Sequence, residues 1–127
     1  MPVRVTWYEP DQIILYKLSD PLTLSDLEAG AVEVWALAAG VSGIVDMIFD
    51  YRAVTEFPRG MLPLMRDGSF TLPTLERVAL VGNEPLVEMM FATITQSTYR
   101  PDPTVHTSVE EAADFLRRMA REDSTRE

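Results

Sequence analysis

The chain has 127 residues, of which 46% are hydrophobic and 24% are charged, and it contains no cysteine. This length suits one domain and excludes two domains of ordinary size, and the apolar content excludes a largely disordered chain. Twenty acidic residues against eleven basic ones give a formal charge of -9, which argues against a nucleic-acid-binding surface. The lack of cysteine excludes disulfides, thiolate metal sites and cysteine nucleophiles, and it is typical of a reducing cytoplasm.

Neither a signal peptide nor a membrane span is predicted. The amino terminus is not followed by a long apolar stretch, as a secretory signal would be. The longest nearly apolar run, residues 31–41, is interrupted by Glu33 and is too short to cross a bilayer. We therefore expect a cytoplasmic protein without an integral membrane segment.

The first part of the chain predicts a β-hairpin followed by a helix. Residues 3–8 alternate apolar and polar side chains, residues 13–18 form a second strand-like run, and turn-forming residues separate them. Ser25 and Glu28 have the spacing of a capping box at a helix start. The apolar positions that follow predict a helix that ends before Gly40.

Strands and helices alternate in the rest of the chain. Residues 44–51 and 77–82 are mostly apolar and short, which predicts central strands covered on both faces, and residues 104–107 predict a shorter strand. The resulting order, β-β-α-β-α-β-α-β-α, implies parallel pairing through right-handed crossovers, with the opening hairpin as an antiparallel edge. We therefore predict an α/β fold with a small, mixed, mostly parallel sheet backed by helices. Residues 1–120 form its single domain, and residues 121–127 are a charged, frayed tail.

The two later helices have start signals of their own. Asn83 is placed to cap the first of them, and Ser108 with Glu111 has capping-box spacing at the start of the second. The helix after Asn83 is expected to present one apolar face, formed by Leu86, Val87, Met90, Phe91 and Ile94. Across the chain, the residues chosen as core positions are Leu27, Ile48, Val81 and Phe115.

The sequence contains no recognisable catalytic or cofactor-binding motif. Walker, G-x-G-x-x-G and G-x-S-x-G patterns are all absent. His106 is the one imidazole, and its place between a short strand and a helix favours a structural role. Without cysteine or a second histidine, a transition-metal site is not expected. We predict no catalytic residue, no cofactor and no metal.

Two aspartates lie within the first central strand. Asp46 and Asp50 share one strand face, with Cα atoms roughly 13 Å apart, which is too far for a glycosidase carboxylate pair. Asp50 stands at the expected carboxyl end of the strand, where ligands bind in open α/β sheets. Structural capping of the following turn is the favoured role of Asp50, and a position facing the ligand crevice is the alternative.

The segment 57–65 is unusual because five apolar side chains accompany two prolines and a glycine. One interpretation is a short helix whose apolar side packs on the sheet. The other is an adaptable, methionine-bearing surface that docks a partner or an apolar ligand. The candidate surface comprises Asp50, Phe57, Arg59, Met61, Leu62 and Met65.

Four stretches, in this order and spacing, resemble the STAS domain family. They are residues 21–27 (PLTLSDL), residues 44–50 (IVDMIFD), residues 77–82 (RVALVG) and residues 108–116 (SVEEAADFL), which together span nearly the whole chain. The resemblance is to the SpoIIAA-like branch, grouped with CRAL-TRIO lipid-transfer proteins. It implies a small mixed sheet backed by helices, and a non-enzymatic module that regulates through protein–protein contact.

The resemblance does not extend to the phosphorylation switch of anti-sigma factor antagonists. In those proteins a serine in an Asp-Ser-Ser-Gly-like turn accepts phosphate from a partner kinase, and the added charge breaks the complex. Counting from Asp50 places Pro58, Arg59 and Gly60 at that turn. Residues 57–65 contain no hydroxyl, so we predict no phosphorylation there.

The sequence therefore predicts a non-enzymatic, cytoplasmic, SpoIIAA-like module that acts through a protein partner. Its contact surface is expected to lie between the first helix and residues 57–65. The alternative is a small carrier or sensor that holds an apolar, lipid-like ligand beneath residues 57–65, and an enzyme is the least favoured class. We also predict a weak-to-moderate homodimer with Met61 or Leu62 in its interface.

Overall fold

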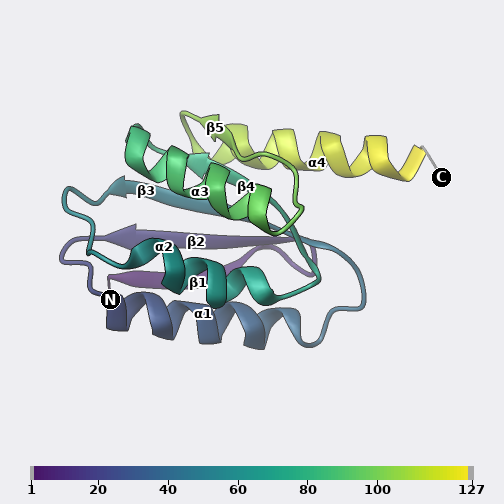
Figure 1. Cartoon of the computed structure of the whole chain (residues 1–127). Coiled ribbons are helices and arrows are strands. Elements are labelled where there is room, and N and C mark those ends of the chain that lie inside the picture. The colour runs from purple at the N-terminus through teal and green to yellow at the C-terminus, as the bar shows by residue number, and fades with distance from the viewer. Residues whose placement is uncertain (1, 126–127) are drawn as a thin grey trace.

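The computed structural model describes residues 2–125, which form one five-stranded sheet with helices on both faces (Figure 1). The strands lie side by side in the order β1-β2-β3-β4-β5, with β1 antiparallel to β2 and the other neighbours parallel. This confirms the predicted fold class. The elements are β1 (Val3–Glu9), β2 (Ile13–Ser19), α1 (Leu24–Ala38), β3 (Val45–Ala53), α2 (Met61–Asp67), a 3-10 turn (Ser69–Thr71), β4 (Leu75–Val81), α3 (Pro85–Ser97), β5 (Thr104–His106) and α4 (Val109–Thr125).

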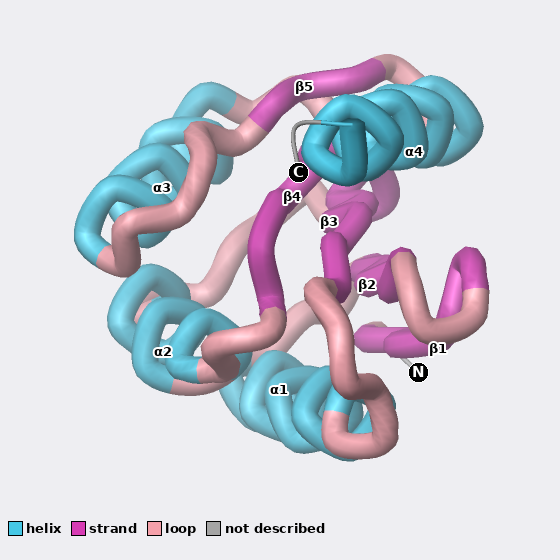
Figure 2. The backbone as a smooth tube through the Cα atoms, turned by 90° about the vertical axis from the view of Figure 1, so that its right-hand side faces the viewer, coloured by secondary structure: helices cyan, strands magenta, loops and turns pink. Residues whose placement is uncertain are grey.

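The helices divide into two layers of unequal size. Figure 2 shows α1, α2 and α3 on one face of the sheet and α4 alone on the other. The larger apolar core lies between the sheet and α1–α3, and a smaller one lies beneath α4. Within residues 2–125, no helix is long and apolar enough to cross a membrane.

Strand β3 is buried on both faces, as predicted. Met47 and Phe49 belong to the larger core, whereas Ile48 belongs to the smaller one. The Phe49 ring is the centre of an aromatic cluster, with ring centroids 5.1 Å from Tyr16 and 4.7 Å from Phe91. Because β3 has apolar layers on both sides, its sequence reads as a nearly continuous apolar run.

Helix α1 begins earlier than its sequence pattern indicated. The capping box is formed by Thr23 and Asp26: the Asp26 N–H donates to Thr23 Oγ1 and the Thr23 N–H donates to Asp26 Oδ2. The predicted box of Ser25 and Glu28 is therefore wrong. The two boxes have the same spacing, and a side-chain pair shifted by two residues makes the same bonds.

The later helix starts also differ in part from expectation. Glu84, rather than Asn83, is the N-cap of α3, and its carboxylate accepts from the Leu86 N–H at 3.3 Å. At the start of α4, Ser108 Oγ accepts from the Glu111 N–H at 3.1 Å, as predicted. The Glu111 carboxylate does not complete the box, because Thr107 donates to it at 2.9 Å.

Helix α4 extends through most of the predicted tail. It continues to Thr125, so residues 121–125 of that tail are helical, and residues 126–127 lie outside the described residues. An ion pair joins this last part of α4 to the sheet, between Arg77 of β4 and Asp123 at 2.6 Å. A pattern of local charges does not reveal that partner.

The chosen core positions are largely confirmed. Leu27, Ile48 and Val81 have no exposed surface. Phe115 is half-buried at the margin of the smaller core, where its ring lies beside His106 and beneath the guanidinium of Arg118. Phe115 thus covers the edge of the core and does not lie within it.

Candidate functional site

The carboxyl ends of β3, β4 and β5 meet at one edge of the sheet, where their arrowheads point in Figure 1. Ligands of open α/β sheets bind outside this edge. A pocket of about 400 Å³, the carboxyl-edge pocket, lies there. Its lining includes Tyr51, Arg52, Phe57, Gly82, Glu84 and His106.

Tyr51 is held tightly at the base of this pocket. Its ring centroid lies 6.1 Å from that of Phe57, and Gly82 approaches so closely that a Cβ atom there would overlap the Tyr51 ring. The Tyr51 hydroxyl has no hydrogen bond of good geometry within the described residues, although the Glu84 backbone lies near it. Burial raises the pKa of Tyr51, the Glu84 backbone opposes this, and the Glu88 carboxylate adds to it. The hydroxyl is therefore neutral and buried, and it makes no hydrogen bond of good geometry with the described residues.

His106 lines the same pocket but is engaged by its neighbours. Its Nε2 lies 2.8 Å from Thr104 Oγ1, and its Nδ1 lies 3.3 Å from a Glu111 carboxylate oxygen. The ring centroid is 5.1 Å from that of Phe115. These contacts use both ring nitrogens and hold the ring in place, as expected of a structural histidine.

Asp50 pairs with Arg52 within the same strand. The Asp50 carboxylate is buried and accepts from the Arg52 backbone N–H at 3.2 Å, from Nε at 3.0 Å and from Nη2 at 2.9 Å. Burial acts to raise the pKa of Asp50, but the hydrogen bonds from Arg52 outweigh it and lower that pKa. Since β3 continues to Ala53, Asp50 does not end the strand, and the prediction that it caps a following turn is corrected. Its role is structural nonetheless.

The structure separates the predicted 57–65 surface into inner and outer side chains. Met61 is 5% exposed and Met65 is 1% exposed, and both belong to the larger core. They lie four residues apart in α2 and therefore share its inner face. Leu62 and Phe57 are half-buried, and Arg59 is exposed. The prediction that Met61 and Met65 contact a partner is thus wrong, whereas Phe57, Arg59 and Leu62 remain accessible.

Helix α1 and α2 lie side by side, and part of the surface expected between them is used within the chain. The Trp35 indole N–H donates to the Gly68 carbonyl at 3.2 Å, which ties α1 to the end of α2. Leu24 lies close to Gly60, at the start of α2. Gly60 has a φ of 86°, a left-handed conformation that suits glycine and lets the chain turn into this short helix.

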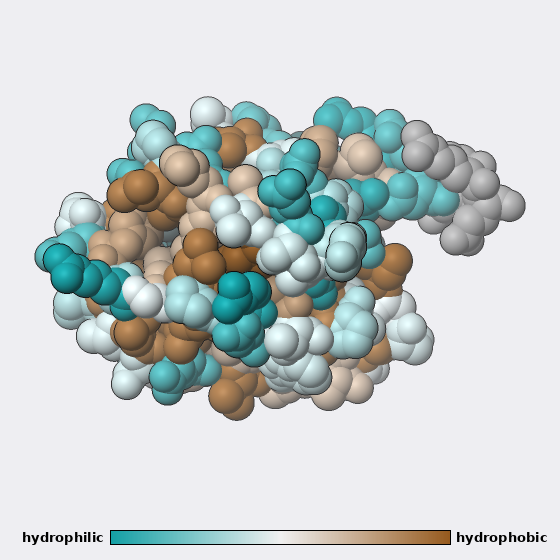
Figure 3. Space-filling model, in the orientation of Figure 1, coloured by the Kyte–Doolittle hydropathy of each residue, from teal (hydrophilic) through white to brown (hydrophobic). Residues whose placement is uncertain are grey.

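The largest exposed apolar side chains near the carboxyl-edge pocket lie at the start of α3. Leu86 is 72% exposed and Met89 is 66% exposed. Figure 3 shows brown, apolar side chains at the end of the helix layer where α3 begins. Leu86 had been expected in the buried face of this helix. Pro85 is the first residue of α3, whose inner face includes Val87 and Met90, whereas Leu86 points outward.

The carboxyl edge carries more acidic than basic groups. Asp20, Glu56 and Arg59 line a neighbouring pocket of about 540 Å³, and Glu84 and Arg52 line the carboxyl-edge pocket itself. The Arg52 guanidinium is paired with Asp50. Asp20 accepts from the Thr55 hydroxyl at 2.6 Å, and this bond and that of the Thr55 N–H lower the pKa of Asp20. The resulting surface combines exposed apolar side chains with a net negative charge.

No protein-family model matches the chain, and no curated protein matches it significantly. Within residues 2–125, no group of three His, Asp or Glu side chains is placed to hold a metal ion. At the carboxyl edge, His106 is engaged by Thr104 and Glu111, and Asp50 is engaged by Arg52. The carboxyl edge thus combines a pocket, two engaged titratable side chains and a buried tyrosine hydroxyl.

Proposed function

We propose that the chain is a non-enzymatic, cytoplasmic protein-interaction module of the STAS type. Its docking surface is the carboxyl-edge pocket together with the first turns of α3. The observation that carries this proposal is the exposure of Leu86 and Met89 in the first turns of α3, directly after Glu84, which lines the pocket. Exposed apolar side chains grouped around a recess are typical of protein interfaces, whose energy is concentrated in a few buried anchors.

The chemistry of the edge indicates what kind of partner fits. An apolar side chain of the partner would contact Leu86 and Met89 and enter the recess beside Phe57. The carboxylates of Asp20, Glu56 and Glu84 favour basic groups around that anchor, and the chain charge of -9 favours a basic protein during approach. We therefore propose a basic partner with an exposed apolar side chain.

A second copy of the chain is the alternative partner for a nearby surface. The charge of -9 opposes casual self-association, so a homodimer requires a specific apolar contact. With Met61 buried, Leu62 is the remaining residue of the predicted dimer contact.

The carrier alternative is less well supported. Met61 and Met65 fill the space between α2 and the sheet, where an acyl chain was expected to lie. An apolar ligand beneath residues 57–65 would have to displace these side chains from the core.

Affinity capture from cells that make this protein, with cross-linking and quantitative mass spectrometry, tests the docking surface. The wild-type chain should retain a defined set of basic proteins, and Leu86→Glu with Met89→Glu should lower their yield at least fivefold. Tyr99→Glu is the matched control, because Tyr99 is 97% exposed just beyond the opposite end of α3. Equal capture by the wild type and the double variant would contradict the proposal.

Sedimentation velocity tests the homodimer separately. A wild-type chain that dimerises should shift toward the monomer when Leu62 is replaced by Glu, while its circular dichroism spectrum stays the same. A wild-type chain that remains monomeric at high concentration excludes the homodimer and leaves the surface to another protein.

A further inference from the structure

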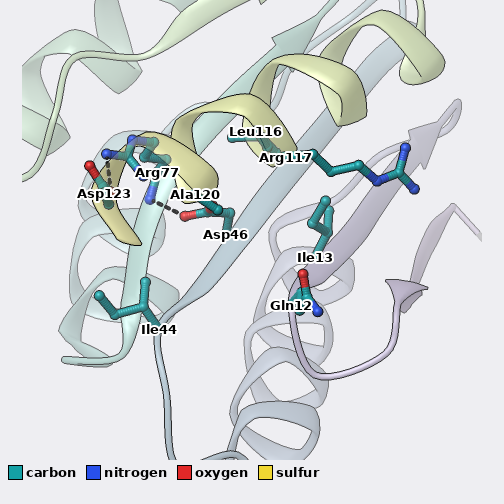
Figure 4. A pocket seen from close by; sticks show the side chains of 9 residues that line it. All are labelled: Gln12, Ile13, Ile44, Asp46, Arg77, Leu116, Arg117, Ala120 and Asp123. Carbon is teal, nitrogen blue, oxygen red and sulfur yellow. Dashed lines mark hydrogen bonds and ion pairs between the residues drawn. The ribbon is translucent and has the colours of Figure 1, made fainter. Parts of the chain in front are cut away.

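A second pocket lies at the opposite end of the parallel strands, and nothing in the proposed function uses it. It has a volume of about 300 Å³ and lies beneath the last turns of α4, at the amino ends of β3 and β4 (Figure 4). We call it the amino-edge pocket. Its lining combines four apolar side chains with five polar or charged ones. The apolar side chains are Ile13, Ile44, Leu116 and Ala120, and the others are Gln12, Asp46, Arg77, Arg117 and Asp123.

One buried carboxyl group, that of Asp46, lines the amino-edge pocket. Asp46 is 6% exposed, and its Oδ1 accepts one hydrogen bond, from the Arg77 backbone N–H at 3.0 Å. The Arg77 guanidinium does not pair with Asp46, because it extends to Asp123 on α4. Figure 4 shows both contacts. Asp46 is thus a buried acid that the described residues supply with one backbone donor and no ion pair.

Ionising such a buried carboxyl group costs free energy. Removing a carboxylate from water without a paired cation disfavours its charged form. Burial raises the pKa of Asp46 to about 6, against the opposing effects of the Arg77 N–H and guanidinium, and Glu76 and Asp123 raise it further. The site is therefore short of positive charge.

The charges around the pocket lead to the same conclusion. Arg117 donates to Glu9 through Nε at 2.9 Å and to Asp114 through Nη1 at 3.3 Å. Both guanidiniums that line the pocket, those of Arg77 and Arg117, are thus bonded to carboxylates other than Asp46. With Glu9 and Asp114 counted beside Asp46 and Asp123, carboxylates outnumber the two guanidiniums around the pocket. A bound cation would therefore be stabilised and a bound anion would be repelled.

We propose that the amino-edge pocket binds a small organic ammonium ion with an apolar body. The ammonium group donates to Asp46, and the apolar body contacts Ile13, Ile44 and Leu116. A primary ammonium has three N–H donors and one positive charge, which are the donor and the charge that Asp46 lacks. A metal ion would require more oxygen ligands than Asp46 alone provides.

An NMR titration with 2-phenylethylamine tests this proposal. Its neutral analogue, 2-phenylethanol, has nearly the same shape and separates the charge from the apolar body. At pH 7.5 the amine should bind at least tenfold more tightly than the alcohol, with amide shift changes at the starts of β3 and β4 and along α4. Binding of neither probe at millimolar concentration, or equal binding of both, would overturn the proposal.

Two aspartate variants assign the effect to one carboxyl group. Asp46→Asn should remove the preference for the amine and leave binding of the alcohol unchanged. Asp50→Asn is the matched control, since Asp50 is an equally buried aspartate on the same face of β3, and it should keep the preference. Tight amine binding to the Asp46→Asn variant would overturn the proposal.

The pH dependence gives a readout that a structural effect would not produce. The amine stays cationic from pH 5 to pH 7.5, whereas Asp46, with its pKa of about 6, must lose a proton before it can pair with the amine. Amine affinity should therefore fall about tenfold between pH 7.5 and pH 5. The Asp46→Asn variant should show no such fall. The other charged groups facing the site are the same in both proteins, namely Glu9 on β1, Glu76 and Arg77 on β4, and Asp114, Arg117 and Asp123 on α4.

A third variant tests the location of the site even if Asp46→Asn fails to fold. Ala120 lies at the exposed side of α4 and lines the pocket, so Ala120→Trp should fill the space while leaving the carboxyl group in place. It should weaken amine binding at least tenfold, and unchanged binding would overturn the proposed location. A further probe, Nα-acetyl-lysinamide, distinguishes a lysine side chain of a protein from a free amine as the source of the ammonium group.

Discussion

Two buried aspartates, one toward each edge of the parallel sheet, differ in the hydrogen bonds that they receive. Asp46 and Asp50 lie four residues apart on one face of β3, and both are buried. Toward the carboxyl edge, Asp50 receives three hydrogen bonds from Arg52. Toward the amino edge, Asp46 receives a single bond from a backbone N–H. Burial by itself therefore does not make a carboxyl group a candidate binding site, and the decisive feature is whether a cation already occupies it.

The two edges also differ in what covers them. At the carboxyl edge the loops after β3 and β4 surround a recess with exposed apolar side chains, a surface suited to another protein. At the amino edge α4 lies over the strands and encloses a smaller space, a shape suited to a small ligand. The same sheet thus supports two distinct binding proposals.

The largest loss of stability is expected for a substitution at Ile48, midway between the two edges. Ile48 lies between Asp46 and Asp50, has no exposed surface and packs in the smaller core beneath α4. Ile48→Ala should lower the free energy of unfolding by roughly 2–5 kcal/mol, through lost burial and the cavity left behind. Urea denaturation measures this loss. A negligible shift in the midpoint would mean that α4 does not cover β3 as described.

The next prediction contrasts the two aspartates. The pKa of Asp46 is raised from 3.8 to about 6, so the folded state holds a proton that the unfolded state releases between these values. Stability should therefore fall as the pH rises through this window, by on the order of 3 kcal/mol. Asp46→Asn should remove this fall and unfold at higher urea concentration than the wild type at pH 7.5.

Asp50 should behave in the opposite way. Its pKa is lowered, so its contribution to stability is present above the ordinary aspartate pKa and is lost as the pH falls through its folded value. Asp50→Asn should cost about 1 kcal/mol at pH 7.5, a modest loss because the Arg52 side chain is half-exposed. If both variants changed stability in the same direction at pH 7.5, the contrast between the edges would be wrong.

A pair of glycines tests the packing at the carboxyl edge, and the control of this pair has the smallest expected effect. A Cβ at Gly82 would overlap the Tyr51 ring at the carboxyl edge, whereas nothing lies within 4 Å of a Cβ at Gly43. Gly82→Ala should cost about 1–3 kcal/mol through overpacking. Gly43→Ala should change stability by less than about 1 kcal/mol, because the alanine side chain meets no neighbour. Thermal unfolding of the two variants measures this difference, and equal melting temperatures would contradict the close packing of Tyr51.

The sequence by itself determined the order of the elements and the class of the fold. Residues 3–8 and 13–18 alternate or cluster as strands do, and residues 44–51 form the apolar run of a strand buried on both faces. These patterns are local, since they follow from the periods of strands and helices. Connection lengths and handedness then limited the arrangement of the strands. The predicted order of strands and helices was therefore confirmed.

The tertiary structure alone decided which of several similar residues makes a contact. Thr23 with Asp26 and Ser25 with Glu28 offer the same capping-box spacing, and the entry of the chain into α1 selects the first pair. Leu86 and Met90 both follow the helical period, and the rotation of α3 leaves Leu86 exposed. Arg77, distant in sequence, lies opposite Asp123 and ties the last turns of α4 to the sheet.

The candidate sites depend on the same long-range placement. Segment 57–65 contains five apolar side chains, and its composition does not reveal which of them α2 turns toward the sheet. Asp46 and Asp50 look alike in sequence because both interrupt the same apolar strand. Their chemistry differs because a side chain two residues away reaches Asp50, whereas the guanidinium nearest Asp46 extends to α4. Local periodicity sets the backbone. The tertiary structure decides which cations, donors and solvent surround a side chain, and these set its pKa and its capacity to bind.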